Sequence, residues 1–244
     1  MKKLTTALLA ASLAPFCLTF GCTGDSDESL QIIQNQVTGA SCVLNTDRTN
    51  FRARSIIDTT SPFGFLFTPL VQSRAQAVDQ GDPLQRAITV QGAETVITFP
   101  EGVGAGVAAA DLEFSTPFSG TLDPGGVAAF GFTTVSDGVL DALRTELTGM
   151  VTAEDPTPSI QLFTEVRVFG ELGGGRVESE PFFYPVDVCL GCLTQTLGDC
   201  STFPPDTVFP SPGAACGSFQ DGLVSCCTAN GALICPGIGT MVTP

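Results

Sequence analysis

The apolar positions between residues 40 and 188 recur in short runs, many of them alternating with polar positions, as is typical of strands that bury one face. Val, Ile, Phe and Thr are common in these runs, and Gly, Pro, Asp and Asn separate them. The runs are FRARSII (51–57), FGFLFTPLV (63–71), AITVQGAETVITF (87–99), DLEFSTPFSGTL (111–122), VAAFGFTTV (127–135), QLFTEVRVFG (161–170) and VESEPFFYPVDV (177–188). The pattern predicts roughly eight strands in one domain.

Glycine and proline mark the connections. Pro69 places its run at the edge or the end of a sheet, and Gly92 indicates either a hairpin or a bulged strand. The DPGG stretch, residues 123–126, is a strong turn signal and predicts a hairpin between the flanking runs. Three glycines at 173–175 allow the last two runs to form a second hairpin.

One segment has the spacing of a helix instead. Leu140, Leu143 and Leu147 fall on one face, and Ser136 or Asp137 can cap the first turn. We therefore expect an all-β fold: a single antiparallel, immunoglobulin-like β-sandwich over residues 40–188 with one short helix. A barrel or two small sandwiches is the alternative.

The first residues have the features of an export signal. Lys2 and Lys3 precede a mostly apolar stretch, residues 4–20, that is short for a membrane span. We predict a signal peptide over residues 1–21. The stretch LTFGC, ending at Cys22, resembles the lipobox of bacterial lipoproteins, and this resemblance implies cleavage before Cys22 and attachment of three acyl chains. Conventional secretion without lipid is the alternative, since Thr19 to Gly21 also fits an ordinary cleavage site.

Residues 22–39 are predicted to be a lipidated tether. Their acidic cluster, Asp25 to Glu28, is interpreted as a solvated spacer rather than a set of cation ligands. Resemblance to enteric lipoproteins, with Thr23 after the cysteine, favours sorting to the outer membrane. The expected location is therefore exported and outer-membrane lipid-anchored, facing the periplasm or the cell surface.

The charge balance excludes one class of partner. The chain has a formal net charge of −15, and both lysines lie in the signal peptide. Such a surface repels nucleic acids and anionic lipid headgroups. Hydrophobic residues make up 43% of the chain, which is enough for a core and argues against a disordered acidic protein.

The missing residue types restrict the chemistry. The chain has no histidine, which excludes Ser-His-Asp and Cys-His catalysis and the common catalytic zinc sites. With no lysine after the signal, Ser-Lys and Schiff-base mechanisms are excluded as well. A carboxylate-dependent polysaccharide hydrolase remains as an alternative, with two acids ~5 or ~6.5–9.5 Å apart.

No catalytic residue, metal site or cofactor is predicted. The glycine-containing stretch GVGAGVAAA, residues 102–110, has Val107 where a dinucleotide-binding loop needs a glycine, and we interpret it as a connecting loop. A calcium-stabilised module is a further alternative, suggested by the acidity alone.

Cysteines give the strongest signal. Beyond Cys22 there are eight: Cys42, Cys189, Cys192, Cys200, Cys216, Cys226, Cys227 and Cys235. An even number in an exported chain predicts four disulfides. Seven lie within residues 189–244, whose Pro-rich and Gly-rich sequence has little apolar periodicity. We therefore predict an irregular tail in which cross-links replace a core, each contributing about 2–4 kcal/mol.

Seven tail cysteines cannot pair completely among themselves. We expect Cys42 to reach Cys189 or Cys192, and Cys226 and Cys227 to bond to different partners because a vicinal disulfide is strained. Two alternatives for the CLGC stretch are half of a four-cysteine zinc site with Cys226 and Cys227, and a thioredoxin-like redox pair.

The plan as a whole resembles uncharacterised predicted lipoproteins of Gram-negative bacteria with cysteine-rich C-termini. The resemblance rests on the lipobox, on YPVDVCLGC at the end of the β domain and on FQDGLVSCCTANGALICP in the tail. It implies no catalytic residue. The resulting hypothesis is a non-enzymatic structural or binding module, anchored in the membrane by its lipid, with an envelope protein or a polysaccharide as its partner.

Overall fold

The computed structural model describes residues 29–61, 63–75, 87–204, 207, 209–216 and 219–235. The predicted signal peptide, Cys22 and the acidic cluster lie outside these residues. The strands are β1 (Leu30–Gln36), β2 (Phe51–Arg52), β3 (Ser55–Asp58), β4 (Phe65–Phe67), β5 (Pro69–Ser73), β6 (Ile88–Thr98), β7 (Glu113–Leu122), β8 (Val127–Ala129), β9 (Phe132–Val135), β10 (Ser159–Leu172), β11 (Gly175–Glu178), β12 (Phe182–Cys189), β13 (Thr194–Asp199), β14 (Val224–Ala229) and β15 (Ala232–Ile234). The helices are η1 (Ala40–Cys42), α1 (Ala109–Leu112), α2 (Asp137–Met150) and η3 (Cys200–Thr202).

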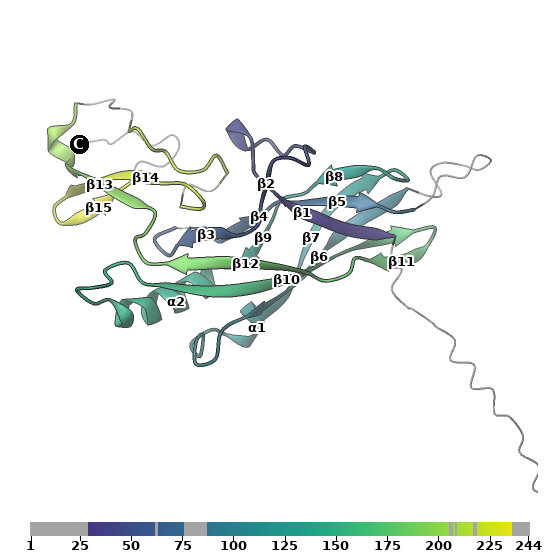
Figure 1. Ribbon diagram of the computed structural model, residues 1–244, viewed down its shortest axis with the longest axis horizontal. Helices are drawn as coiled ribbons and strands as arrows, with labels where there is room; N and C mark the ends of the chain where they lie inside the picture. The colour runs from purple at the N-terminus through teal and green to yellow at the C-terminus, as the bar shows by residue number, and fades with distance from the viewer. Residues whose placement is uncertain are drawn as a thin grey trace, which may run out of the picture.

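Two sheets form the body of the molecule (Figure 1). The smaller has the order β2-β1-β5-β8, and the larger has the order β3-β12-β10-β6-β7, with β11 paired to β10. Ile32 and Val71 from the smaller sheet share one buried cluster with Val90, Val166 and other residues of the larger sheet. The sheets therefore pack face to face, and the all-β prediction is confirmed.

The elements with the strongest local signals form as predicted. Helix α2 buries Leu140, Leu143 and Leu147, and the Ser136 hydroxyl accepts a hydrogen bond from the Val139 amide at its start. Strands β10 and β12 pair antiparallel over eight residue pairs. At Gly92, β6 continues as one strand with a register shift, so the bulged strand is the correct alternative.

Other connections differ from the prediction. The run at 51–57 divides into β2 and β3, which belong to different sheets, and the run at 63–71 divides into β4 and β5. The DPGG turn joins β7 to β8, but β7 pairs with β6 and β8 with β5. That turn carries the chain from one sheet to the other, so the predicted hairpin is wrong. Strand β12 pairs with β3 in parallel, as does β13 with β14.

The sandwich also begins earlier in the chain than the predicted residue 40. Strand β1 lies inside residues 22–39, the predicted tether, and pairs with both β2 and β5. Its alternate apolar side chains Leu30 and Ile32 are buried in the core. The described part of the predicted tether is therefore mostly a central strand of the smaller sheet.

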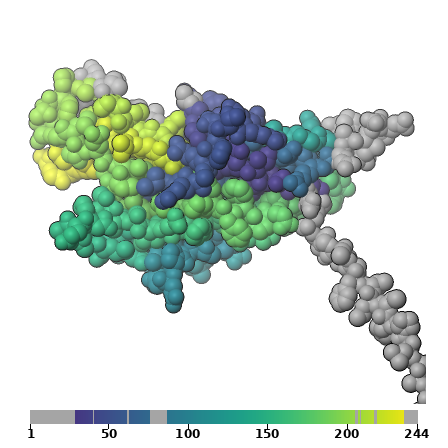
Figure 2. All heavy atoms as spheres, viewed as in Figure 1, coloured from purple at the N-terminus to yellow at the C-terminus, as the bar shows by residue number. Residues whose placement is uncertain are grey.

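The segment after β12 forms a separate lobe beside the sandwich (Figure 2). It was predicted to be irregular, but it contains a three-stranded sheet in the order β13-β14-β15. Its apolar clusters are small. One joins Phe209 to Cys200 and Cys227, and the other joins Phe219 to Val224 and Cys226. That the disulfides substitute for a core in this lobe stays a prediction.

Candidate functional site

The outer face of the larger sheet has an ordered set of exposed side chains. Phe183 on β12 pairs with Glu165 on β10, which pairs with Val96 on β6, and Val96 pairs with Glu113 on β7. Directly paired residues point to the same face of a sheet. These four side chains therefore form one row across four strands, on the side opposite the core.

A second row lies beside the first. Arg167, Glu94 and Ser115 follow one another across β10, β6 and β7. All members of the two rows except Phe183, together with helix α1, line a groove of about 760 Å³, a volume within the usual range of about 300–1,000 Å³ for ligand sites. We call these two rows and the groove the outer-face groove.

Ion pairs hold the polar groups of this groove in place. The Arg167 guanidinium donates to Glu165 Oε1 at 2.9 Å, and Arg176 on β11 donates to Glu94 Oε1 at 2.7 Å and to Glu178 at 2.5 Å. Arg176 also lies over the Phe169 ring, 4.5 Å from its centroid. Hydrogen bonds to Glu178 and Glu94 raise the pKa of Arg176. The groove is thus fixed and polar, with three carboxylates and one arginine in its lining.

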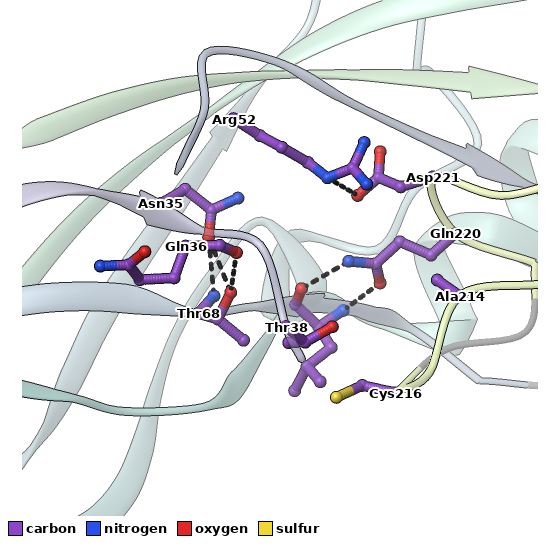
Figure 3. A pocket seen from close by; sticks show the side chains of 10 residues that line it. Asn35, Gln36, Thr38, Arg52, Thr68, Ala214, Cys216, Gln220 and Asp221 are labelled. Carbon is purple, nitrogen blue, oxygen red and sulfur yellow. Dashed lines mark hydrogen bonds and ion pairs between the residues drawn. The ribbon is translucent and has the colours of Figure 1, made fainter. Parts of the chain in front are cut away.

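A second polar region lies where the tail meets the sandwich (Figure 3). Asn35, Arg52, Gln220 and Asp221 line a pocket of about 20 Å³ there. That space holds about one water molecule. The pocket is therefore part of the junction between tail and sandwich and is too small for an organic ligand.

Asp221 is the centre of this junction. Its carboxylate accepts hydrogen bonds from the Ile56 amide and the Ser55 hydroxyl, both at 2.9 Å, and Ser55 Oγ lies 2.7 Å from the Tyr184 hydroxyl. Burial raises the pKa of Asp221, against the hydrogen bond from Ile56 and the charge of Arg52 3.6 Å away. Burial likewise raises the pKa of Tyr184. These partners are buried or bonded to one another, as in a structural network.

The CLGC stretch is organised around the buried carboxylate of Asp58. This group accepts hydrogen bonds from the amides of Gly191 at 3.0 Å and Leu193 at 2.9 Å, and also from the amide and hydroxyl of Thr60. Among the described residues, Asp58, Cys189 and Cys192 form a group of potential metal ligands whose ligand atoms lie within 4.8 Å of one another. The two sulfurs are bonded to each other and the carboxylate is fully hydrogen-bonded, so this donor set does not fit a metal.

All eight predicted cysteines are in disulfides. The pairs are Cys42–Cys216, Cys189–Cys192, Cys200–Cys227 and Cys226–Cys235. Cys226 and Cys227 have different partners, as predicted, and Cys42 does reach the tail. Its predicted partner, Cys189 or Cys192, is wrong. Cys42 does not precede the first strand but lies between β1 and β2, next to the tail segment that carries Cys216.

The disulfides also bear on the zinc and redox alternatives. The four sulfurs of the zinc alternative, from Cys189, Cys192, Cys226 and Cys227, each bond to another sulfur. No helix follows Cys189, since the chain continues through a turn into β13. The helix N-terminus that lowers a thiol pKa in redox proteins is therefore missing from this described segment.

The groove was not predicted from the sequence. Its glutamates come from three strands and have no shared local motif, whereas each lies at an outward position of an alternating run. The signal that could have found them is the glutamate at a polar position of each of the runs at 87–99, 111–122 and 161–170. The lipidation residue Cys22 lies outside the described residues.

Comparison with known proteins assigns no family. No family model and no curated protein matches the chain. A solved structure, the crystal structure of a protein from Archaeoglobus fulgidus, is similar over 52% of this chain and 90% of its own length, with 14% identity and a TM-score of 0.32. At that level of similarity it assigns neither a family nor a function.

Four disulfides indicate an oxidising, extracytoplasmic environment. Within the described ranges, no helix has both the length and the apolar character to cross a membrane.

Proposed function

We propose that the protein is a membrane-anchored extracytoplasmic lipoprotein and acts as a non-enzymatic binding module. The observation that carries the binding role is the outer-face groove. It combines a suitable volume with polar side chains fixed by ion pairs, on the exposed face of a sheet that is rigid because its other face is core. Anchoring rests on the lipobox at Cys22 and on the extracytoplasmic location that the disulfides indicate.

The position of β1 indicates how the anchored protein would be oriented relative to the membrane. Strand β1 begins at Leu30, so seven residues separate it from Cys22, and these span at most about 25 Å. Leu30 bridges to Ser179, the residue after β11, and β11 lies at the end of the molecule opposite the tail (Figure 1). A lipid on Cys22 therefore holds the sandwich close to the membrane with the cysteine-rich lobe facing away. Outer-membrane sorting, to the periplasmic or the cell-surface side, is part of the proposal.

Two experiments test the two halves of the proposal. Cells expressing the full chain are labelled with an alkyne fatty acid, and we expect label on the wild type and none on Cys22→Ala. Separately, a photo-crosslinking residue replaces Ser115 in the groove, with exposed Thr145 on α2 as the matched control position. We expect crosslinked products in intact envelopes from position 115 only. An unlabelled wild type refutes anchoring, and equal crosslinking at the two positions refutes the groove.

A polysaccharide hydrolase is the second candidate, and one observation favours it. Glu113 and Glu165 flank Val96 on the same face, and two strand spacings place their Cα atoms about 9–10 Å apart. Inverting glycosidases have carboxyl groups ~6.5–9.5 Å apart. Glu165 is held by Arg167 as a hydrogen-bond acceptor, whereas the acid of a glycosidase must donate a proton. Release of reducing ends from a polysaccharide by the wild type, abolished in Glu113→Gln, would establish the hydrolase and replace the binding module.

A further inference from the structure

We infer that the ligand of the outer-face groove is a neutral glycan chain, an inference that rests on the proposed function. Two exposed rings continue the groove onto β10 and β12. The Phe183 side chain is 62% exposed and the Phe163 side chain is 41% exposed. Both lie on the solvent face of the larger sheet, since Phe183 pairs with Glu165 and Phe163 pairs with Pro185. Single surface Phe residues are ordinary, but two on one face beside a groove form a platform.

The two rings are arranged to act together. Phe163 and Phe183 are diagonal neighbours on adjacent strands, a relation that places such residues about 7–8 Å apart. A third ring on this face, Phe169, is already covered by Arg176. Phe163 and Phe183 thus leave open ring faces on which the C–H face of a sugar can stack, and one chain can contact both.

The polar groups next to these rings suit hydroxyl groups. Each sugar hydroxyl both donates and accepts a hydrogen bond. Glu165 and Glu94 offer carboxylate lone pairs beyond those used by Arg167 and Arg176, and Glu113 and Ser115 line the same groove. Because the ion pairs fix these groups before a ligand arrives, binding requires little ordering of side chains. The rings, the carboxylates and the Ser115 hydroxyl, spread over the two rows and the adjacent Phe163, match an extended glycan.

The charge of the protein and of the groove determines which class of glycan can bind. The chain has a formal net charge of −15, and the three glutamates that line the groove face two arginines, Arg167 in the lining and Arg176 paired with Glu94 beside it. This field repels uronate-containing and sulfated polysaccharides. It also disfavours the nucleic acids that stacking platforms bind in other proteins. A neutral glycan satisfies both the rings and the polar groups without a charge penalty.

Binding of defined oligosaccharides to the full-length protein in detergent tests the inference. Isothermal titration calorimetry is carried out with cellohexaose and with chitohexaose as neutral probes, and with oligogalacturonate as the anionic probe. We expect at least one neutral probe to bind and the anionic probe not to bind. Phe183→Ala and Phe163→Ala should each weaken binding at least about tenfold. Phe63→Ala is the matched control, since Phe63 is 70% exposed and belongs to neither β10 nor β12.

Three results overturn the inference: no binding of either neutral probe, binding of oligogalacturonate alone, or unchanged affinity in both phenylalanine variants. Circular dichroism of the variants, which remove only exposed side chains, verifies that they are folded. The outcome is separable from that of the proposed function. If position 115 crosslinks in envelopes and Cys22 carries lipid while neither neutral probe binds, the binding module stands and the glycan is excluded as its ligand.

Discussion

The sandwich and the tail are held together by different means. In the sandwich, side chains from both sheets, from β4 and β9 and from α2 form one continuous buried cluster. Among the described residues of the tail, the two buried clusters have three residues each, and half of these six residues are cysteines. The same chain thus uses an apolar core in the sandwich and covalent bonds in the tail. This difference predicts that the two regions respond differently to the same perturbation.

Reduction of the disulfides should have the largest effect, and it should unfold the tail while the sandwich stays folded. With its small clusters, the reduced tail lacks enough buried apolar area to offset its conformational entropy, whereas the sandwich retains its core. We expect hydrogen-exchange mass spectrometry to show loss of protection in β13, β14 and β15 after reduction. Protection in β6 and β10 should persist. Equal loss in both regions would show that the sandwich also depends on the cross-links.

A truncation in the apolar core should instead destabilise the sandwich. Phe67 is fully buried, and its ring contacts those of Phe132, Phe182 and Tyr184 at centroid distances of 5.8, 6.0 and 5.2 Å. Phe67→Ala should lower the free energy of unfolding by about 3–5 kcal/mol. Urea denaturation measures this effect. The control, Phe63→Ala, should change it by less than about 0.5 kcal/mol because that side chain is exposed.

Deleting single disulfides should cost more unfolding free energy when the disulfide closes a long sequence separation than when it closes a short one. Cys42–Cys216 closes a sequence separation of 174 residues, and its removal by paired Ser substitutions should cost about 2–4 kcal/mol of unfolding free energy. Cys189–Cys192 closes a separation of three residues, and Asp58 already holds the same turn by hydrogen bonds. Its removal should cost less, about 2 kcal/mol or below. A larger cost for the short bridge in thermal unfolding would contradict the role assigned to Asp58.

The smallest effect concerns pH and the contact between the two regions. Burial raises the pKa of Asp221 above its ordinary value of 3.8, so the folded state favours the protonated carboxyl. Its contribution to stability is fully present below the unfolded value and is lost as the pH rises through the raised value. The amide side chain in Asp221→Asn cannot ionise, so the variant should not lose this stability as the pH rises. We expect the melting temperature of the variant minus that of the wild type to increase between about pH 3 and pH 7. A pH-independent difference would show that folding does not raise the pKa of Asp221.

Features that depend on neighbouring residues were predictable from the sequence. Helix α2 follows from Leu140, Leu143 and Leu147 because its side chains meet the core at helical spacing, and Ser136 caps it locally. The β10–β12 hairpin follows from two long alternating runs joined by glycines. The eight paired cysteines follow from parity and from the predicted export.

Features that depend on distant partners were not predictable from the sequence. The DPGG turn reverses the chain, but a turn sequence does not specify which strand each arm pairs with, and the arms joined different sheets. Strand β1 was missed because its short apolar pattern follows an acidic cluster, although its burial depends on β2 and β5. The partner of Cys42 depended on that missed strand. The groove, assembled from residues of β6, β7 and β10, has no local signature.

The tail also completes the larger sheet. Strand β3 pairs with β12 on one side. On its other side, the Asp58 amide donates to Phe219 O, Ile57 bridges to Gln220, and the Asp221 amide donates to Ile56 O. The Gln220 side-chain amide extends this pairing to the backbone of Leu66, at 2.7 and 2.9 Å. An open strand edge is a template for pairing with another molecule. Since residues 219–221 follow the whole sandwich in the chain, the sandwich has an uncovered edge during export until they arrive, and a chain shortened before Phe219 would be expected to aggregate through β3.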